Sequence, residues 1–326
     1  MTFEVFLSSV YGSLGQGLLF ALVAIGIFLN LRVMKAPDLT VEGSFAFGGA
    51  IAMTLLSQGH HYALVLLIAP LGGAAAGLAT SLIHTKLKID GIVAGLLVTM
   101  ALFSINLFVM NGSTISAPLD TFVFTPIRLN LVSSGMAPFD ALLWSYIIVG
   151  AIVLTIVITS LFLLFKTSYG LSIRATGSNE YMARSNGVNT DSRKIFTLVL
   201  SNTIVALAGA LVVQQQSGAS VNTGVGVLVI GLAGLVIGEV LTRKKAGILE
   251  RMLFIVLGSF IYFTVVSLII VSGLMSPDAT RLLTALLTLT ALCVPKFKEI
   301  PFSKIRLPQK KQSTTESQMN TEVNND

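Results

Sequence analysis

Charged residues, cysteine and histidine are scarce in this sequence of 326 residues. Only 11% of the residues are charged, whereas soluble domains carry about 25%. This composition excludes an ordinary soluble protein. The single cysteine, Cys293, excludes a disulfide framework and a thiol metal site. His60 and His61 are neighbours and His84 stands apart, so no three histidine ligands occur at metal spacing.

Motifs for catalysis and nucleotide binding are missing as well. No GxxxxGK[ST] motif occurs, so the chain is not expected to bind nucleotide by itself. No His, Asp and Ser set suggests an active site. We therefore expect a protein that is not an enzyme and has no cofactor or metal. If ATP drives its action, another subunit must hydrolyse the ATP.

Hydrophobic residues make up 54% of the chain and gather in nine segments. Each segment is roughly long enough for the ~30 Å hydrocarbon core of a bilayer. This pattern predicts an all-α polytopic membrane protein with about nine transmembrane helices (eight to ten). The segments are Ser8–Leu31, Val41–Ser57, Tyr62–Ile83, Ile92–Met110, Ala141–Phe165, Ile195–Val213, Val225–Leu241, Met252–Ser272 and Leu282–Val294.

Basic residues predict which side of the membrane each loop occupies. With the N-terminus outside and the C-terminus cytoplasmic, every lysine and arginine except Arg128 and Arg281 falls on the cytoplasmic side. Because these residues lie between apolar segments, the net charge of +6 does not indicate nucleic-acid binding. We expect a transmembrane domain over residues 1–295 and a basic, then disordered, cytoplasmic tail over 296–326.

One cytoplasmic loop, residues 166–194, holds the most polar internal stretch of the chain. Such a stretch cannot lie in hydrocarbon, where unpaired polar groups are costly. Ser178 and Asn179 suit the start of a short helix from Glu180, which should stop near Gly187. The alternative is a helix lying on lipid headgroups, but with few large apolar side chains its anchoring would be weak.

Polar residues within the apolar segments are few. Asp38 and Glu42, at the cytoplasmic start of the second segment, either line a water-filled path or stabilise a helix N-terminus. Asn106 and Asn202 can hydrogen-bond a polar solute. Gln214 and Gln215, with Gln216, either line an outer gate or cap a helix.

Small residues and one charge pair complete the pattern. GxxxG motifs at residues 73–77 and 234–238 allow close helix packing, within one bundle or against another subunit. Glu239 and Arg243 are four residues apart, which favours a local ion pair.

The cytoplasmic stretch resembles the permease subunits of ABC importers of the branched-chain amino acid and ribose type. Their pattern stands here as Arg174-Ala175-Thr176-Gly177-Ser178-Asn179, followed by Ala183, Gly187 and Val188, and the A-G-A that ends the following helix stands at 208–210. Residues 37–45, PDLTVEGSF, resemble a narrower branch found beside a binding lipoprotein and associated with amino acids, tryptophan and tyrosine included. Some relatives have ten spans.

The resemblance implies two permease copies, expected to be a homodimer, with a cytoplasmic ATPase docked on each. An extracellular substrate-binding lipoprotein would deliver the solute. Import of a sugar or a nucleoside stays an alternative. A second alternative is a stand-alone ion-coupled transporter, which would require ionisable residues at the membrane midplane. The residues implied in ATPase coupling are Arg174, Gly177, Asn179, Glu180, Ala183 and Gly187; those expected along the pathway are Asp38, Glu42, Asn106, Asn202, Gln214 and Gln215.

Overall fold

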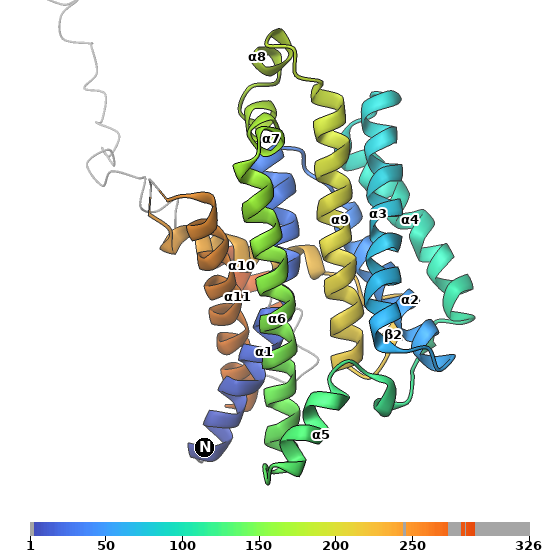
Figure 1. Ribbon diagram of the computed structural model, residues 1–326, viewed down its shortest axis with the longest axis vertical. Helices are drawn as coiled ribbons and strands as arrows, with labels where there is room; N and C mark the ends of the chain where they lie inside the picture. Colours follow the sequence, from blue (N-terminus) through green and yellow to red (C-terminus); the bar gives the residue numbers. More distant parts are fainter. Residues whose placement is uncertain (1–2, 244–245, 273–281, 284, 291–326) are drawn as a thin grey trace, which may run out of the picture.

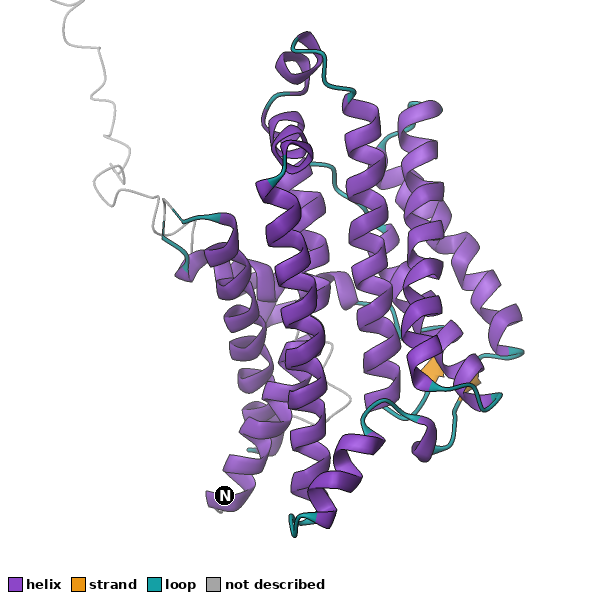
Figure 2. Cartoon of the chain, in the orientation of Figure 1, coloured by secondary structure: helices purple, strands orange, loops and turns teal. Residues whose placement is uncertain are grey.

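The computed structural model describes residues 3–243, 246–272, 282–283 and 285–290. The helices in this part are joined by loops, and the strands described are one pair of two residues each (Figure 2). The long helices are α1 (Phe3–Phe28) with its π-helical continuation η1 (Leu29–Met34), α2 (Thr40–Ser57), α3 (Tyr62–Lys86), α4 (Gly91–Met110), α6 (Pro138–Lys166), α9 (Thr190–Gln215), α10 (Val227–Leu241) and α11 (Ile248–Val271).

Short elements lie at the two ends of the bundle (Figure 1). At the upper end in that view, α7 (Ser168–Ser178) and α8 (Glu180–Ser185) project together. At the lower end lie the 3-10 turn η2 (Leu119–Thr121), α5 (Thr125–Ser133) and the pair formed by β1 (Thr114–Ile115) and β2 (Ala219–Ser220).

Six helices are long and apolar enough to span a membrane, fewer than the nine predicted segments. They are Ser8–Met34, Tyr62–Lys86, Gly91–Met110, Pro138–Lys166, Thr190–Gln215 and Ile248–Val271. Helix α10 has only 15 residues, about 22 Å at 1.5 Å per residue, and α2 begins with a polar turn. Of the predicted segment Leu282–Val294, only 282–283 and 285–290 are described, and those are helical.

Helix α9 is the central helix, packed against α1, α2 and α3. Glycine makes these contacts close. A Cβ at Gly209 would overlap the carbonyl of Phe45 on α2, and one at Gly73 would overlap the carbonyl of Asn202. Without a hydrophobic drive between helices in lipid, such backbone contact is a main source of attraction.

Both GxxxG motifs pack within this bundle. Gly73 and Gly77 of α3 lie against α9, while Gly234 and Gly238 of α10 lie against α11. Of the two alternatives for these glycines, packing within one bundle is therefore confirmed. By contrast, large apolar side chains are exposed on α3, α4 and α6, with Phe108 of α4 85% exposed.

After α9 the chain turns back into the bundle. Ser220 pairs with Thr114 of β1, and residues 221–226 then run to the first turn of α2. A Cβ at Gly224 would overlap the carbonyl of Glu42, and Gly226 begins α10 with φ +84°. This return segment places the N-terminus of α10 beside Glu42.

Candidate functional site

The end formed by α7 and α8 carries the residues expected to act in coupling. Asn179 caps α8, its side chain accepting the backbone N–H of Met182 at 3.0 Å. At the other end Gly187 has φ +79°, and the Val188 and Gly187 amides bond the carbonyls of Ala183 and Arg184 at 3.0 Å each. This is the Schellman pattern. The predicted short helix is confirmed, although it ends at Ser185.

The two faces of this segment differ sharply. Tyr181 and Met182 are 88% and 65% exposed, whereas Ala183 is 4% exposed. Gly177 is also buried, and a Cβ there would overlap the Val33 carbonyl at the end of η1. Gly177 and Ala183 therefore contact this chain itself, and Tyr181 and Met182 form the outward tip of α8.

Charges fasten α8 to the start of α9. Glu180 accepts hydrogen bonds from Lys194 at 2.8 Å and from Arg184 at 3.1 Å. Arg184 also pairs with Asp191 at 3.1 Å. The hydrogen bond from Lys194 is the main reason why the pKa of the Glu180 carboxyl lies below its usual value. Helix α8 is thus attached to α9 through Glu180, the first residue of α8.

This ion pair predicts how the attachment of α8 depends on pH. The pKa of Glu180 is lower in the folded state than in the unfolded state. The stability that its ion pair gives to the attachment of α8 is therefore fully present above the unfolded pKa and is lost as the pH falls through the folded pKa. We expect amide exchange in residues 180–186 to stay constant from neutral pH down to the usual carboxyl range, after correction for intrinsic rates, and to rise below it. Glu180→Gln should exchange several-fold faster at neutral pH. Equal protection in the two proteins would contradict the attachment.

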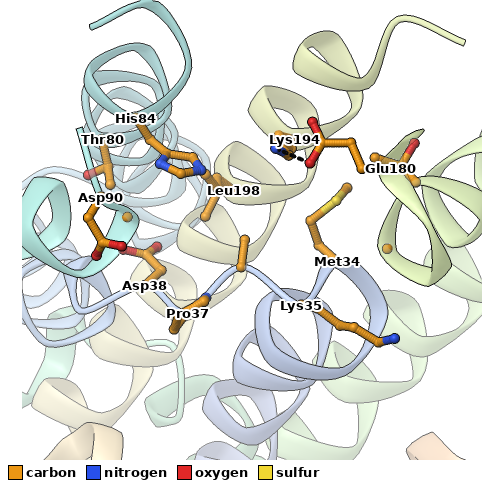
Figure 3. A pocket seen from close by; sticks show the side chains of 14 residues that line it. Met34, Lys35, Pro37, Asp38, Thr80, His84, Asp90, Glu180, Lys194 and Leu198 are labelled. Atoms are coloured by element: carbon orange, nitrogen blue, oxygen red, sulfur yellow. Dashed lines mark hydrogen bonds and ion pairs between the residues drawn. The ribbon is translucent and has the colours of Figure 1, made fainter. Parts of the chain in front are cut away.

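A cavity of about 250 Å³ lies beneath α8. In Figure 3, Asp38, His84 and Asp90 gather on one side of it and the bonded pair Glu180–Lys194 on the other. The cavity therefore separates the projecting segment from the first turns of α2 and α4.

Asp38 also belongs to a buried network. Its carboxylate accepts the Nδ2–H of Asn202 at 2.7 Å, that of Asn30 at 3.3 Å and the backbone N–H of Thr40 at 2.8 Å. Asn202 in turn accepts the Ser44 hydroxyl at 2.7 Å. The structure brings the two predicted pathway residues Asp38 and Asn202 together, in the interior of the bundle where α1, α2 and α9 meet.

Glu42 and Asn106 lie elsewhere, beside one another in the wall of a second hollow. Glu42 accepts the backbone N–H of Gly226 at 3.0 Å, so it caps α10 as well as opening α2. The next residue, Gly43, packs on Thr99 in the middle of α4. Glu42 is in the first turn of α2, as the sequence predicted, although this turn packs beside the middle of α4 rather than beside its end.

The remaining polar candidates lie at the end of α9 and near the end of α10. Gln214 accepts the Val123 N–H at 2.9 Å and fastens the loop after α4 to α9. The side-chain oxygen of Gln215 is buried without a hydrogen-bond partner in the described part of the chain. Glu239 accepts hydrogen bonds from two N–H donors of Arg32 in η1, with 2.6 Å from Nε to Oε1. This corrects the expected local pair with Arg243, since η1 ends beside α10.

The family model for the permease component of branched-chain amino acid transport systems matches residues 9–292. The chain belongs to this permease family. It is a membrane-embedded permease of an ABC importer in the cell membrane and is not itself catalytic. Among the described residues of the permease, no three His, Cys, Asp or Glu side chains gather as metal ligands.

Curated relatives cover most of the permease. It is 32% identical over 286 residues to the tyrosine transport system permease protein of Clostridioides difficile, covering 88% of this chain and 91% of the relative. An uncharacterised protein of Rickettsia prowazekii is 25% identical over 88% of this chain and 98% of its own length. The ribose import permease protein of Haemophilus influenzae is 27% identical over 67% of this chain and 64% of its own length. No solved structure matches the permease.

Family membership implies an ATPase and a substrate-binding protein as partners. Two features of the geometry were not predicted from the sequence: α7, and the return segment 216–226. The glycines at 218, 224 and 226 were a signal for the return, because closely spaced glycines favour turns and close backbone approach.

Proposed function

We propose that this permease imports an amino acid, tyrosine or tryptophan included, driven by a separate ATPase that docks on α8. The substrate class is supported by similarity to the tyrosine permease over 91% of that relative. The docking role is supported by one observation in particular: α8 presents an exposed tip, Tyr181 and Met182, from a base held against two helices.

The same proposal includes the arrangement in the membrane. Nine spans within residues 1–295, with the N-terminus outside and the tail 296–326 in the cytoplasm, account for the distribution of basic residues. In this arrangement α7 and α8 face the cytoplasm and α5 faces outward. A homodimer would enclose the pathway, and an extracellular lipoprotein would deliver the solute to its outer mouth.

Force would reach the bundle along two routes. The first route is the hydrogen bond between Glu180 of α8 and Lys194 at the start of α9. The second is the contact of Gly177 in α7 with Val33 and Met34 at the end of η1. Both helices are long and packed closely together, since the hydroxyl of Ser201 on α9 donates to the Gly26 carbonyl of α1 at 2.7 Å. Movement of α8 would therefore shift α1 and α9 as a unit.

Copurification with the ATPase tests the docking role. In the double variant Tyr181→Ala/Met182→Ala, the amount of copurified ATPase and the uptake of labelled tyrosine or tryptophan should each fall at least tenfold. The reason is that the variant removes the contact surface and leaves the bundle unchanged. Leu129→Ala, which trims an exposed residue of α5, is the matched control and should behave as wild type.

Two results would contradict the proposal. Normal ATPase binding by the double variant would exclude α8 as the docking element. Uptake of ribose, with no uptake of any amino acid by wild-type proteoliposomes containing ATPase and binding protein, would exclude the substrate class.

A further inference from the structure

A small hollow lies between α2, α4 and the return segment. It holds about 60 Å³ and is lined by Glu42, Gly43 and Ala46 of α2, by Thr99, Phe103 and Asn106 of α4, and by Val221, Gly224 and Val225. Phe103 and Val225 are 45% and 56% exposed, so the hollow opens between them to the outside of the single subunit.

Hydrogen-bond acceptors line the polar part of this hollow. Asn106 is only 1% exposed, and its side-chain oxygen has no hydrogen-bond partner in the described part of the chain. The Thr99 hydroxyl donates its proton to the Leu39 carbonyl at 3.1 Å, which leaves its oxygen free to accept. A buried acceptor without a donor is unfavourable, so this arrangement favours a ligand that brings donors.

Glu42 adds a negative charge to these acceptors. Its carboxylate accepts the Gly226 N–H, and none of the ion pairs found among the described residues involves it. The four residues of α4 and α2 that flank it, Thr99, Phe103, Gly43 and Ala46, carry no charge. The hollow is thus a site for a positive group, since an unpaired carboxylate within a bundle needs a cationic partner.

We propose that this hollow binds the ammonium group of the transported solute during its passage. An ammonium carries three donors and no acceptor, which matches a carboxylate, an amide oxygen and a hydroxyl oxygen. A volume of about 60 Å³ holds such a group but not a whole amino acid, so the rest of the solute lies beyond Phe103 and Val225. This inference rests on the proposed import of amino acids and names the group that the permease recognises.

Uptake by reconstituted permease, ATPase and binding protein tests the site. Glu42→Gln keeps an oxygen for the Gly226 N–H and removes only the charge; Asn106→Leu removes the free acceptor, and Asn106→Asp retains an acceptor. We expect the first two variants to lower uptake of labelled tyrosine and tryptophan at least tenfold. Asn106→Asp should keep more than half of the uptake. Phe108→Leu, on the outer face of the same helix, is the control.

The outcomes separate the site from the substrate class. If wild type takes up an amino acid and Glu42→Gln and Asn106→Leu do so equally well, the site is overturned and the proposed function stands. If wild type takes up ribose but no amine, both are overturned. If wild type takes up an amine that is not an amino acid and both variants lose this uptake, the ammonium site is supported and the amino acid substrate class is overturned.

A thiol probe gives a second measurement that needs no substrate. With Cys293→Ser as background, Val225→Cys places a thiol at the mouth of the hollow. A cationic methanethiosulfonate should react at least fivefold faster than an anionic one, and Glu42→Gln should remove this preference. Equal rates for the two reagents in the presence of Glu42 would overturn the proposal.

Discussion

Replacing Gly177 with valine is expected to reduce uptake by the permease at least a hundredfold while the protein still inserts in the membrane. Even a single Cβ at this position would overlap the Val33 carbonyl, which belongs to the backbone of η1 and cannot turn aside as a side chain would. Helix α7 must then separate from η1. The route from α8 to α1 is interrupted, although the bundle helices keep their contacts.

The measurements are uptake and ATPase copurification in parallel. Gly177→Val should still bind some ATPase through the tip of α8, because Tyr181 and Met182 remain exposed, but it should not couple hydrolysis to transport. Gly247→Val is the control: Gly247 precedes the first turn of α11, and a Cβ there meets no atom within 4 Å. Uptake by Gly177→Val at the level of Gly247→Val would contradict the role assigned to this contact.

Local features of the fold could be predicted from the sequence because they depend on neighbours in the chain. The cap at Asn179 and the left-handed turn at Gly187 follow from side-chain and backbone preferences within eight residues. Of the nine predicted apolar segments, eight likewise coincide with helices α1, α2, α3, α4, α6, α9, α10 and α11. The burial of Gly73 and Gly77 against α9 followed from the need for small residues between helices in lipid.

Features that depend on distant contacts could not be predicted. The side of α8 on which Ala183 lies is set by the ion pair of Glu180 with Lys194, fourteen residues away. The partner of Glu239 is Arg32, separated by 207 positions. The start of α2 is held against α4 by the packing of Gly95 on Asp38 and Leu39, which lie far from Gly95 in the sequence.

The network around Asp38 shows why the polar candidates divide into two groups. Asp38 and Asn202 are hydrogen-bonded to one another inside the bundle, and this bond holds the start of α2 against α9. Asn106 has a side-chain oxygen without a partner in the described part of the chain, and Glu42 takes part in none of the ion pairs found there. From sequence alone the two groups look alike, since each contains one acid and one asparagine.

Asn202→Leu is expected to destabilise the permease more than any other single change to a polar side chain of the bundle. The leucine removes the 2.7 Å donor to Asp38 and the 2.7 Å acceptor for Ser44. The buried Asp38 carboxylate then loses one of its donors, and a hydrogen bond to a charged group contributes about 1.5–3 kcal/mol. Ser44→Ala removes only one neutral hydrogen bond and should cost about 1 kcal/mol.

Thermal unfolding in detergent, followed by loss of monodisperse protein, measures this order. Thr203→Val is the matched control on the same helix, because the Thr203 hydroxyl bonds only the Val199 carbonyl of its own turn, at 2.7 Å. The midpoint should fall most for Asn202→Leu, slightly for Ser44→Ala and least for Thr203→Val. A midpoint for Asn202→Leu equal to that of Thr203→Val would mean that Asp38 finds other donors, and that α2 and α9 are held together by their glycine contacts alone.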